Sequence, residues 1–167
     1  MKPTSKRFDL ILFALGICAL VALAQSPRMF TATGNVNAFG LWKMNPASST
    51  GPRFFRENLT VRFEPHTKGE VFTLDRIDPD GRSTTSSTIL YLDGNPREFQ
   101  GFGCSGTQSS RRVDSQTVEI VRICASGEWT RFVRRLSARP KELVLEITEQ
   151  QPGGRRAERR VVLEKQQ

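Results

Sequence analysis

Few side chains in this 167-residue sequence combine a reactive type with a spacing that supports chemistry. His66 is the one histidine, so no second imidazole is available for a zinc site, and little remains from which to build a catalytic triad. Asp75, Asp78 and Asp80 precede Gly81, but their spacing does not match a calcium-binding loop, and a tight turn accounts for them. We therefore expect a protein that is not an enzyme, with no catalytic residue, no metal site and no cofactor.

The N-terminal residues have the pattern of a secretory signal peptide. Lys2, Lys6 and Arg7 form a positive segment, residues 10–23 are almost wholly apolar, and Ala22-Leu23-Ala24 matches an A-x-A cleavage site. The alternative is a single membrane anchor, although residues 8–23 are fewer than the roughly 20 apolar residues that a spanning helix needs. The pattern predicts a signal peptide over residues 1–24 and a secreted or periplasmic protein.

Cysteine usage fits an exported protein. Cys18 lies in the predicted signal peptide, so the mature chain keeps an even pair, Cys104 and Cys124. The alternative, two free catalytic thiols, lacks a C-x-x-C spacing or a neighbouring histidine. We expect a Cys104–Cys124 disulfide, which would stabilise the fold by roughly 3 kcal/mol through loop closure.

The predicted disulfide depends on the register of two strands. If residues 105–112 and 117–124 are antiparallel around a turn at 113–115, Arg112 pairs with Gln116 and the two cysteines face each other. A two-residue turn at Asp114-Ser115 would offset them by one residue instead. The sequence leaves both registers open.

Basic residues outnumber acidic ones, 25 to 17, which gives a formal net charge of +8. Two interpretations of the arginines remain open: they face solvent on strands and keep the protein soluble, or they bind an anionic cell-envelope polymer or a protein partner. Export makes nucleic acid an unsuitable partner, and we expect none. Eight of the arginines lie in two stretches: Arg131, Arg134, Arg135, Arg139, Arg155, Arg156, Arg159 and Arg160.

Short runs rich in Val, Ile, Phe, Thr and Leu, each closed by turn residues, predict an all-β domain over residues 39–167, after an irregular leader at 25–38. The count is eight or nine strands, and the sequence leaves open whether residues 97–100 form a short extra one. The predicted strands are residues 41–45, 58–64, 70–77, 83–92, 106–112, 117–124, 129–136, 142–149 and 157–164.

Several of these runs alternate apolar and polar residues. Leu59, Val61 and Phe63 share one face of their predicted strand, while Thr60 and Arg62 share the other. Tight turns between consecutive strands predict an antiparallel up-and-down meander, and closing it into a barrel removes its exposed edges. A two-sheet sandwich has the same local pattern and stays open as the alternative.

The start of the first strand carries a resemblance to a known family. Gly40-Leu41-Trp42 forms a G-x-W motif, Lys43-Met44-Asn45 follows it, and the domain over residues 39–165 resembles lipocalins and the lipocalin-like, calycin-type β-barrel domains of secreted bacterial proteins. The resemblance implies that Gly40 and Trp42 are structural residues, and that Trp42 packs under the barrel and is capped by a basic side chain from the last strand. The candidates for this cap are Arg159, Arg160 and Lys165, of which we take Arg160.

The resemblance also implies a barrel cavity that holds one small apolar or amphipathic molecule, and a carrier or sensor function. The alternative is a solid-core barrel whose arginine-rich surface binds an anionic envelope component or a protein. Tyr91 and Arg122 are the expected polar anchors, but the sequence does not fix which strand faces point inward. The candidate ligand-binding residues are Phe63, Phe72, Leu74, Tyr91, Phe99, Phe102, Arg122 and Phe132.

Overall fold

The computed structural model describes residues 37–51, 58–139, 141–150 and 153–167. The predicted signal peptide and all but the last two residues of the predicted leader lie outside the described residues. The described chain contains one short 3-10 helix, η1 (Pro46–Ser48), and no helix in this part of the chain has the length and apolar character to cross a membrane. Its strands are β1 (Gly40–Met44), β2 (Asn58–His66), β3 (Gly69–Ile77), β4 (Ser83–Leu90), β5 (Arg97–Gly101), β6 (Cys104–Arg112), β7 (Thr117–Cys124), β8 (Trp129–Leu136), β9 (Glu142–Gln150) and β10 (Arg156–Lys165).

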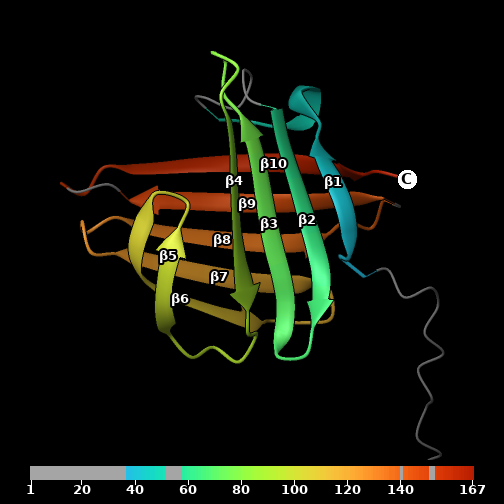
Figure 1. The fold of residues 1–167 in the computed structure, drawn as a ribbon. Helices are drawn as coiled ribbons and strands as arrows, with labels where there is room; N and C mark the ends of the chain where they lie inside the picture. The colour runs from blue at the N-terminus through green and yellow to red at the C-terminus, as the bar shows by residue number, and fades with distance from the viewer. Residues whose placement is uncertain (1–36, 52–57, 140, 151–152) are drawn as a thin grey trace, which may run out of the picture. The chain divides into compact units, whose positions relative to one another are not determined.

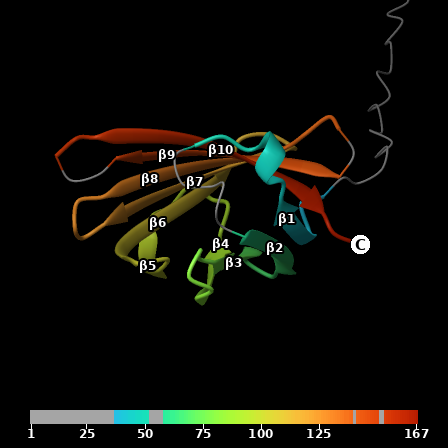
Figure 2. The ribbon, with the colours of Figure 1, turned by 90° about the horizontal axis from the view of Figure 1, so that it is seen from above.

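The described residues belong to one compact unit, Asn35–Gln167, and form one antiparallel sheet with the order β4-β3-β2-β1-β10-β9-β8-β7-β6-β5. Consecutive strands pair in the sheet, except β4 and β5, which form its two edges. In addition, the first strand, β1, pairs with the last, β10. The sheet curls so that β2 to β4 cross in front of β7 to β10 (Figure 1), and the view from above shows the curl (Figure 2). The all-β meander is confirmed as a nearly closed barrel of one continuous sheet, and not a two-sheet sandwich.

The described part of the chain has ten strands, so the expected count of eight or nine is wrong. The difference lies in Arg97–Gly101, which forms the complete edge strand β5 and pairs with β6. Its sequence, REFQG, has one apolar residue, Phe99, between charged and polar neighbours. That pattern is weak because an edge strand needs only one ladder of hydrogen bonds and little apolar surface.

The β6–β7 register differs from both expected registers. Arg112 pairs with Val118 instead of Gln116, because the backbone N–H of Val113 donates to Thr117 O and leaves a three-residue turn between them. The register is therefore displaced by two residues, so Cys104 lies diagonally across from Cys124. A displacement of two keeps both side chains on the same face, and the disulfide is present with a Cα–Cα distance of 5.3 Å.

The barrel interior divides into two halves along its axis. At the end that holds the β2–β3, β6–β7 and β8–β9 turns, the interior is filled with apolar side chains. A buried ion pair adds to this filling: Arg134 on β8 donates from both terminal nitrogens to Glu70 on β3, and Arg112 Nη2 donates to Glu70 Oε1 at 2.8 Å. The largest fully buried side chains of the described residues are Trp42, Phe63, Leu90, Ile120, Leu143 and Leu163.

Side-chain hydrogen bonds cross the opening between β4 and β5, where the backbone ladder is interrupted. The N–H of Phe102 donates to Ser86 Oγ at 3.1 Å, and the N–H of Leu92 donates to Ser110 Oγ at 3.2 Å. Between them, Gln108 Nε2 donates to Thr88 Oγ1 at 3.2 Å. These bonds join the two edges of the sheet through side chains.

Candidate ligand-binding site

A cavity of about 330 Å³ occupies the other half of the barrel, at the end with the β3–β4, β5–β6 and β7–β8 turns. Strands from both sides of the barrel contribute to its wall, and the lining mixes apolar side chains with a few charged ones. The volume lies at the lower end of the range for small-molecule sites. The apolar lining residues are Leu59, Phe72, Leu74, Phe102, Trp129, Phe132, Leu145 and Ile147, and the charged ones are Arg76, Arg122, Glu128, Glu149 and Arg159.

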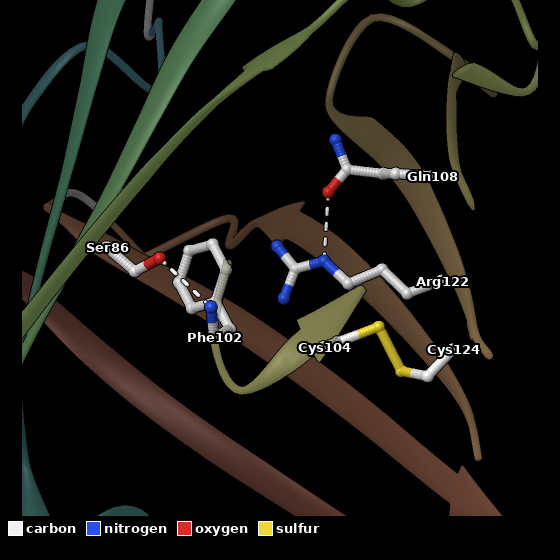
Figure 3. The surroundings of a disulfide bond; sticks show 6 residues. All are labelled: Ser86, Phe102, Cys104, Gln108, Arg122 and Cys124. Carbon is white, nitrogen blue, oxygen red and sulfur yellow. Dashed lines mark hydrogen bonds between the residues drawn. A yellow bond between two sulfur atoms is a disulfide. The ribbon is translucent and has the colours of Figure 1, made fainter. Parts of the chain in front are cut away.

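Arg122 on β7 is the most unusual group in this wall, because it is a buried cation, only 4% exposed. Its Nε donates to Gln108 Oε1 at 2.9 Å, and its guanidinium points toward Phe102 (Figure 3). No described residue supplies a hydrogen-bond partner to its Nη2. Burial lowers the pKa of Arg122 to about 10, because the charged form has lost its water. The group is still protonated at neutral pH.

Phenyl rings surround this guanidinium. The Cζ atom of Arg122 lies 4.1 Å from the ring centroid of Phe102, 4.7 Å from that of Phe132 and 4.8 Å from that of Phe99. Phe72 is further away, at 5.9 Å. Ring faces attract a cation, so these contacts offset part of the cost of burial, but they supply no hydrogen-bond acceptor to the terminal nitrogens.

The disulfide lies beside Arg122 and forms part of the cavity wall (Figure 3). It ties Cys104, the first residue of β6, to Cys124, the last residue of β7. Gly106 pairs with Cys124 in the ladder, and a Cβ at Gly106 would lie 2.1 Å from the carbonyl oxygen of Ile123, so only glycine fits there. Because the disulfide joins the start of β6 to the end of β7, it holds the β5–β6 turn, which contains Phe102, close to β7.

The structure brings five of the eight predicted ligand-binding residues to the cavity wall: Phe72, Leu74, Phe102, Arg122 and Phe132. The other three lie elsewhere. Phe63 is 1% exposed in the packed half, and Phe99 is buried behind the guanidinium. Tyr91 lies outside the cavity, under the guanidinium of Arg97 at 3.9 Å, so it is not placed to act as the expected polar anchor.

The structure also places residues in the wall that the sequence reasoning did not select. Two of them, Arg76 and Arg159, form ion pairs with carboxylates: Arg76 Nε lies 2.9 Å from Asp78 Oδ1, and Arg159 Nη2 donates to Glu149. Alternation along β10 places Arg159 on the same face as the buried Val161. The sequence pattern therefore identifies Arg159 as a wall residue, provided that the inward face is known.

Trp42 packs in the packed half of the barrel, as the resemblance implies, and is only 1% exposed. Its Nε1 donates to Ala38 O at 2.6 Å. The expected cap, Arg160, is a wrong assignment. Arg160 is on the outer face, where its Nη1 donates to Ser48 O at 3.3 Å, because strand alternation turns it away from the tryptophan. Lys165 takes the place beside Trp42, with its Nζ 5.5 Å from the ring.

The position of Gly40 follows from the same contact. Gly40 has φ 115°, and a Cβ at this position would lie 3.1 Å from Cε of Lys165. The glycine therefore satisfies a backbone conformation that favours glycine and leaves room for the lysine that lies over the tryptophan.

The single histidine is remote from this cavity. His66 ends β2 in the β2–β3 turn, at the packed end of the barrel, where its Nδ1 accepts a hydrogen bond from the N–H of Lys68 at 3.1 Å. No group of three His, Cys, Asp or Glu side chains lies close enough to hold a metal ion among the residues that the structure describes.

These features define a small antiparallel β-barrel, packed at one end and hollow at the other, with a buried arginine in the hollow. No protein-family model matches the sequence, and no curated protein matches it. Among solved structures, the fold is similar to that of the zebrafish ileal bile acid-binding protein complexed with cholic acid, with a TM-score of 0.49 and 14% identity, over 77% of this chain and 98% of that one. A similarity of this size assigns neither a family nor a ligand.

Proposed function

We propose that this protein is a non-catalytic binding protein, a carrier or sensor, that holds one small apolar or amphipathic molecule in the cavity at the hollow end of its barrel. The observation that carries the proposal is the cavity itself, about 330 Å³ and walled by side chains from opposite sides of the barrel. Burial of apolar ligand surface against these side chains would supply the affinity, and the few polar groups would orient the ligand.

We further propose that the protein works outside the cytoplasm, as a secreted or periplasmic protein. The N-terminal pattern supports this location, and the Cys104–Cys124 disulfide supports it too, because structural disulfides persist mainly in oxidising compartments.

The arginine-rich surface favours the alternative function less. Arg134 is not a surface residue, because it lies inside the barrel in an ion pair with Glu70. Several others are paired on the outer face, such as Arg131 with Glu119 at 2.6 Å and Arg135 with Glu146 at 3.6 Å. Paired arginines present a weaker positive field to an anionic polymer, so the cavity is the stronger candidate site.

Native mass spectrometry tests the proposed function directly. The mature, oxidised protein is weighed before and after organic extraction, and an adduct that extraction removes identifies a ligand. In parallel, the extracted protein is titrated with N-phenyl-1-naphthylamine, an uncharged apolar dye whose fluorescence rises on burial. We expect saturable binding of one dye per chain.

A matched pair of variants locates the dye. Ile147→Trp fills the cavity from β9, whereas Thr148→Trp adds the same ring to the opposite face of the same strand. Ile147→Trp should weaken dye binding at least about tenfold while Thr148→Trp leaves it unchanged. Absence of dye binding by the wild type, or equal binding by both folded variants, would overturn the proposal.

A further inference from the structure

A cation without a carboxylate lies in the wall of the proposed cavity. Arg76 and Arg159 also line this wall, and both have carboxylate partners, Asp78 and Glu149. No ion pair joins Arg122 to a carboxylate in the described part of the chain. Within the same described residues, its one hydrogen bond runs from Nε to the neutral amide of Gln108, and Nη2 meets no acceptor.

Burying a cation without a carboxylate partner lowers the stability of the fold. Removing a guanidinium from water without a counter-ion is among the least favourable burials in a fold, and arginine retains its charge there. Apolar residues of similar volume usually serve stability as well or better than a buried charge. The position on β7 is therefore poorly explained by packing and well explained by a partner that arrives with the ligand.

We propose that Arg122 anchors the acidic group of the ligand, so that the molecule in the cavity is a monoanionic amphiphile with a carboxylate at one end. This inference rests on the proposed function and specifies the class of its ligand. The carboxylate would accept hydrogen bonds from the terminal nitrogens of Arg122, and the apolar body would lie against the remainder of the cavity wall.

The surroundings of Arg122 favour a planar monoanion. Cζ of Arg122 lies over the Phe102 ring, 4.1 Å from its centroid. The N–H groups of a guanidinium lie in its plane, and a carboxylate meets them there with its own planar pair of oxygens. Among the described residues that line the cavity, a second negative charge meets no second cation without a carboxylate, because Arg76 is paired with Asp78 and Arg159 with Glu149. Glu128, at the β7–β8 turn of the same wall, adds negative charge and further disfavours a dianion.

A matched pair of ligands tests the inference: decanoate and 1-decanol differ only in the terminal group. Each is titrated at pH 7.5 by displacement of N-phenyl-1-naphthylamine from the extracted protein. We expect the wild type to bind decanoate at least about tenfold more tightly than decanol, since charge-assisted hydrogen bonds are the strong ones.

Arg122→Met removes the anchor and keeps an apolar side chain of similar length. This variant should bind the two ligands equally, with its affinity for decanol within about twofold of that of the wild type. Arg131→Met on the outer face of β8 is the control, because it removes the same charge from the chain while leaving the cavity intact, and it should keep the preference for decanoate.

Thermal unfolding of the ligand-free variants separates an anchor from a structural arginine. An anchor predicts that Arg122→Met melts at the same temperature as the wild type or higher, and that decanoate raises the melting temperature of the wild type more than decanol does. Decanol binding without a preference for decanoate, or an unchanged preference in Arg122→Met, would overturn the inference while leaving the proposed function standing. Binding of neither ligand nor dye would overturn both.

Discussion

Gln108 links Arg122 to the opening of the barrel. Its Oε1 accepts from Arg122 Nε at 2.9 Å, and its Nε2 donates to Thr88 Oγ1 on β4 at 3.2 Å. One amide thus contacts both the buried cation and the opposite edge of the sheet. The hydrogen-bond partner of Arg122 is therefore a neutral amide. Replacing that amide by a carboxylate would place a negative charge beside Arg122.

Gln108→Glu supplies Arg122 with a carboxylate inside the protein. We expect the ligand-free variant to be at least as stable as the wild type, because the buried cation gains a counter-ion. We also expect the affinity for decanoate to fall about tenfold while that for decanol is retained, since the site is then already neutralised. Displacement titrations of both ligands measure this, and an undiminished affinity for decanoate would contradict it.

Removal of the disulfide should lower stability without abolishing the fold. Cys104 and Cys124 are separated by 20 residues, and loop-closure entropy for a loop of this size corresponds to about 3 kcal/mol. Urea unfolding of Cys104→Ala/Cys124→Ala should show this loss relative to the oxidised wild type. The reduced wild type should resemble the variant, and a reducing agent should leave the variant unchanged; a loss below about 1 kcal/mol would show that the constraint is already present in the unfolded chain.

The strands were predictable from the sequence because alternation survives small errors of position. Of the two registers left open, the one that pairs Arg112 with Gln116 differs from the observed β6–β7 register by two residues. The disulfide was nevertheless predicted correctly, since a displacement of two returns each side chain to its own face. A displacement of one would have separated Cys104 from Cys124. Local pattern thus determined the face that residues share, whereas the turn at 114–116 determined the register.

The candidate site was only partly predictable. Arg122 and Arg134 both occur in alternating strands among apolar neighbours, and nothing in either sequence tells which face points inward. The structure buries both: Arg134 pairs with Glu70, whereas Arg122 has no carboxylate partner among the described residues. That difference depends on where β3 returns after pairing with β2, which is a long-range property that no local spacing reports.

The pairing of Glu70 with Arg134 predicts a large stability effect in the packed half of the barrel. Both side chains are nearly inaccessible, 5% exposed for Glu70 and 3% for Arg134, so Glu70→Gln leaves Arg134 with an uncompensated buried charge. Unfolding free energy should fall by about 3 to 5 kcal/mol, as is typical when one partner of a buried pair is removed. Chemical denaturation at neutral pH measures the loss.

A second variant shows whether the charge itself is responsible. Glu70→Leu combined with Arg134→Met removes both charges and keeps apolar volume, so most of the lost stability should return. Arg112 retains access to solvent, with its side chain 45% exposed, and therefore tolerates the loss of Glu70. If the double variant is no more stable than Glu70→Gln, the pair acts through its shape and hydrogen bonds and not through its charge.

Phe102 separates the cavity from the opening between β4 and β5. It lines both the 330 Å³ cavity and a second hollow of about 430 Å³ beside β4, which also contacts Ser86. Phe102 is held in the left-handed region at φ 54°, and its N–H bond to Ser86 Oγ closes the turn against β4. A bulky residue in this conformation is held by its surroundings, so we expect the cavity wall to open at this turn.

Phe102→Ala should therefore accelerate ligand access. The association rate of N-phenyl-1-naphthylamine, followed by stopped-flow fluorescence, should rise about tenfold, because an apolar barrier between the opening and the cavity has been removed. Ser86→Ala weakens the closed turn and should act in the same direction with a smaller effect. Phe132→Ala is the matched control, since it enlarges the same cavity from β8, away from the opening. Equal acceleration by Phe102→Ala and Phe132→Ala would show that cavity size, and not the position of the ring at the opening, limits access.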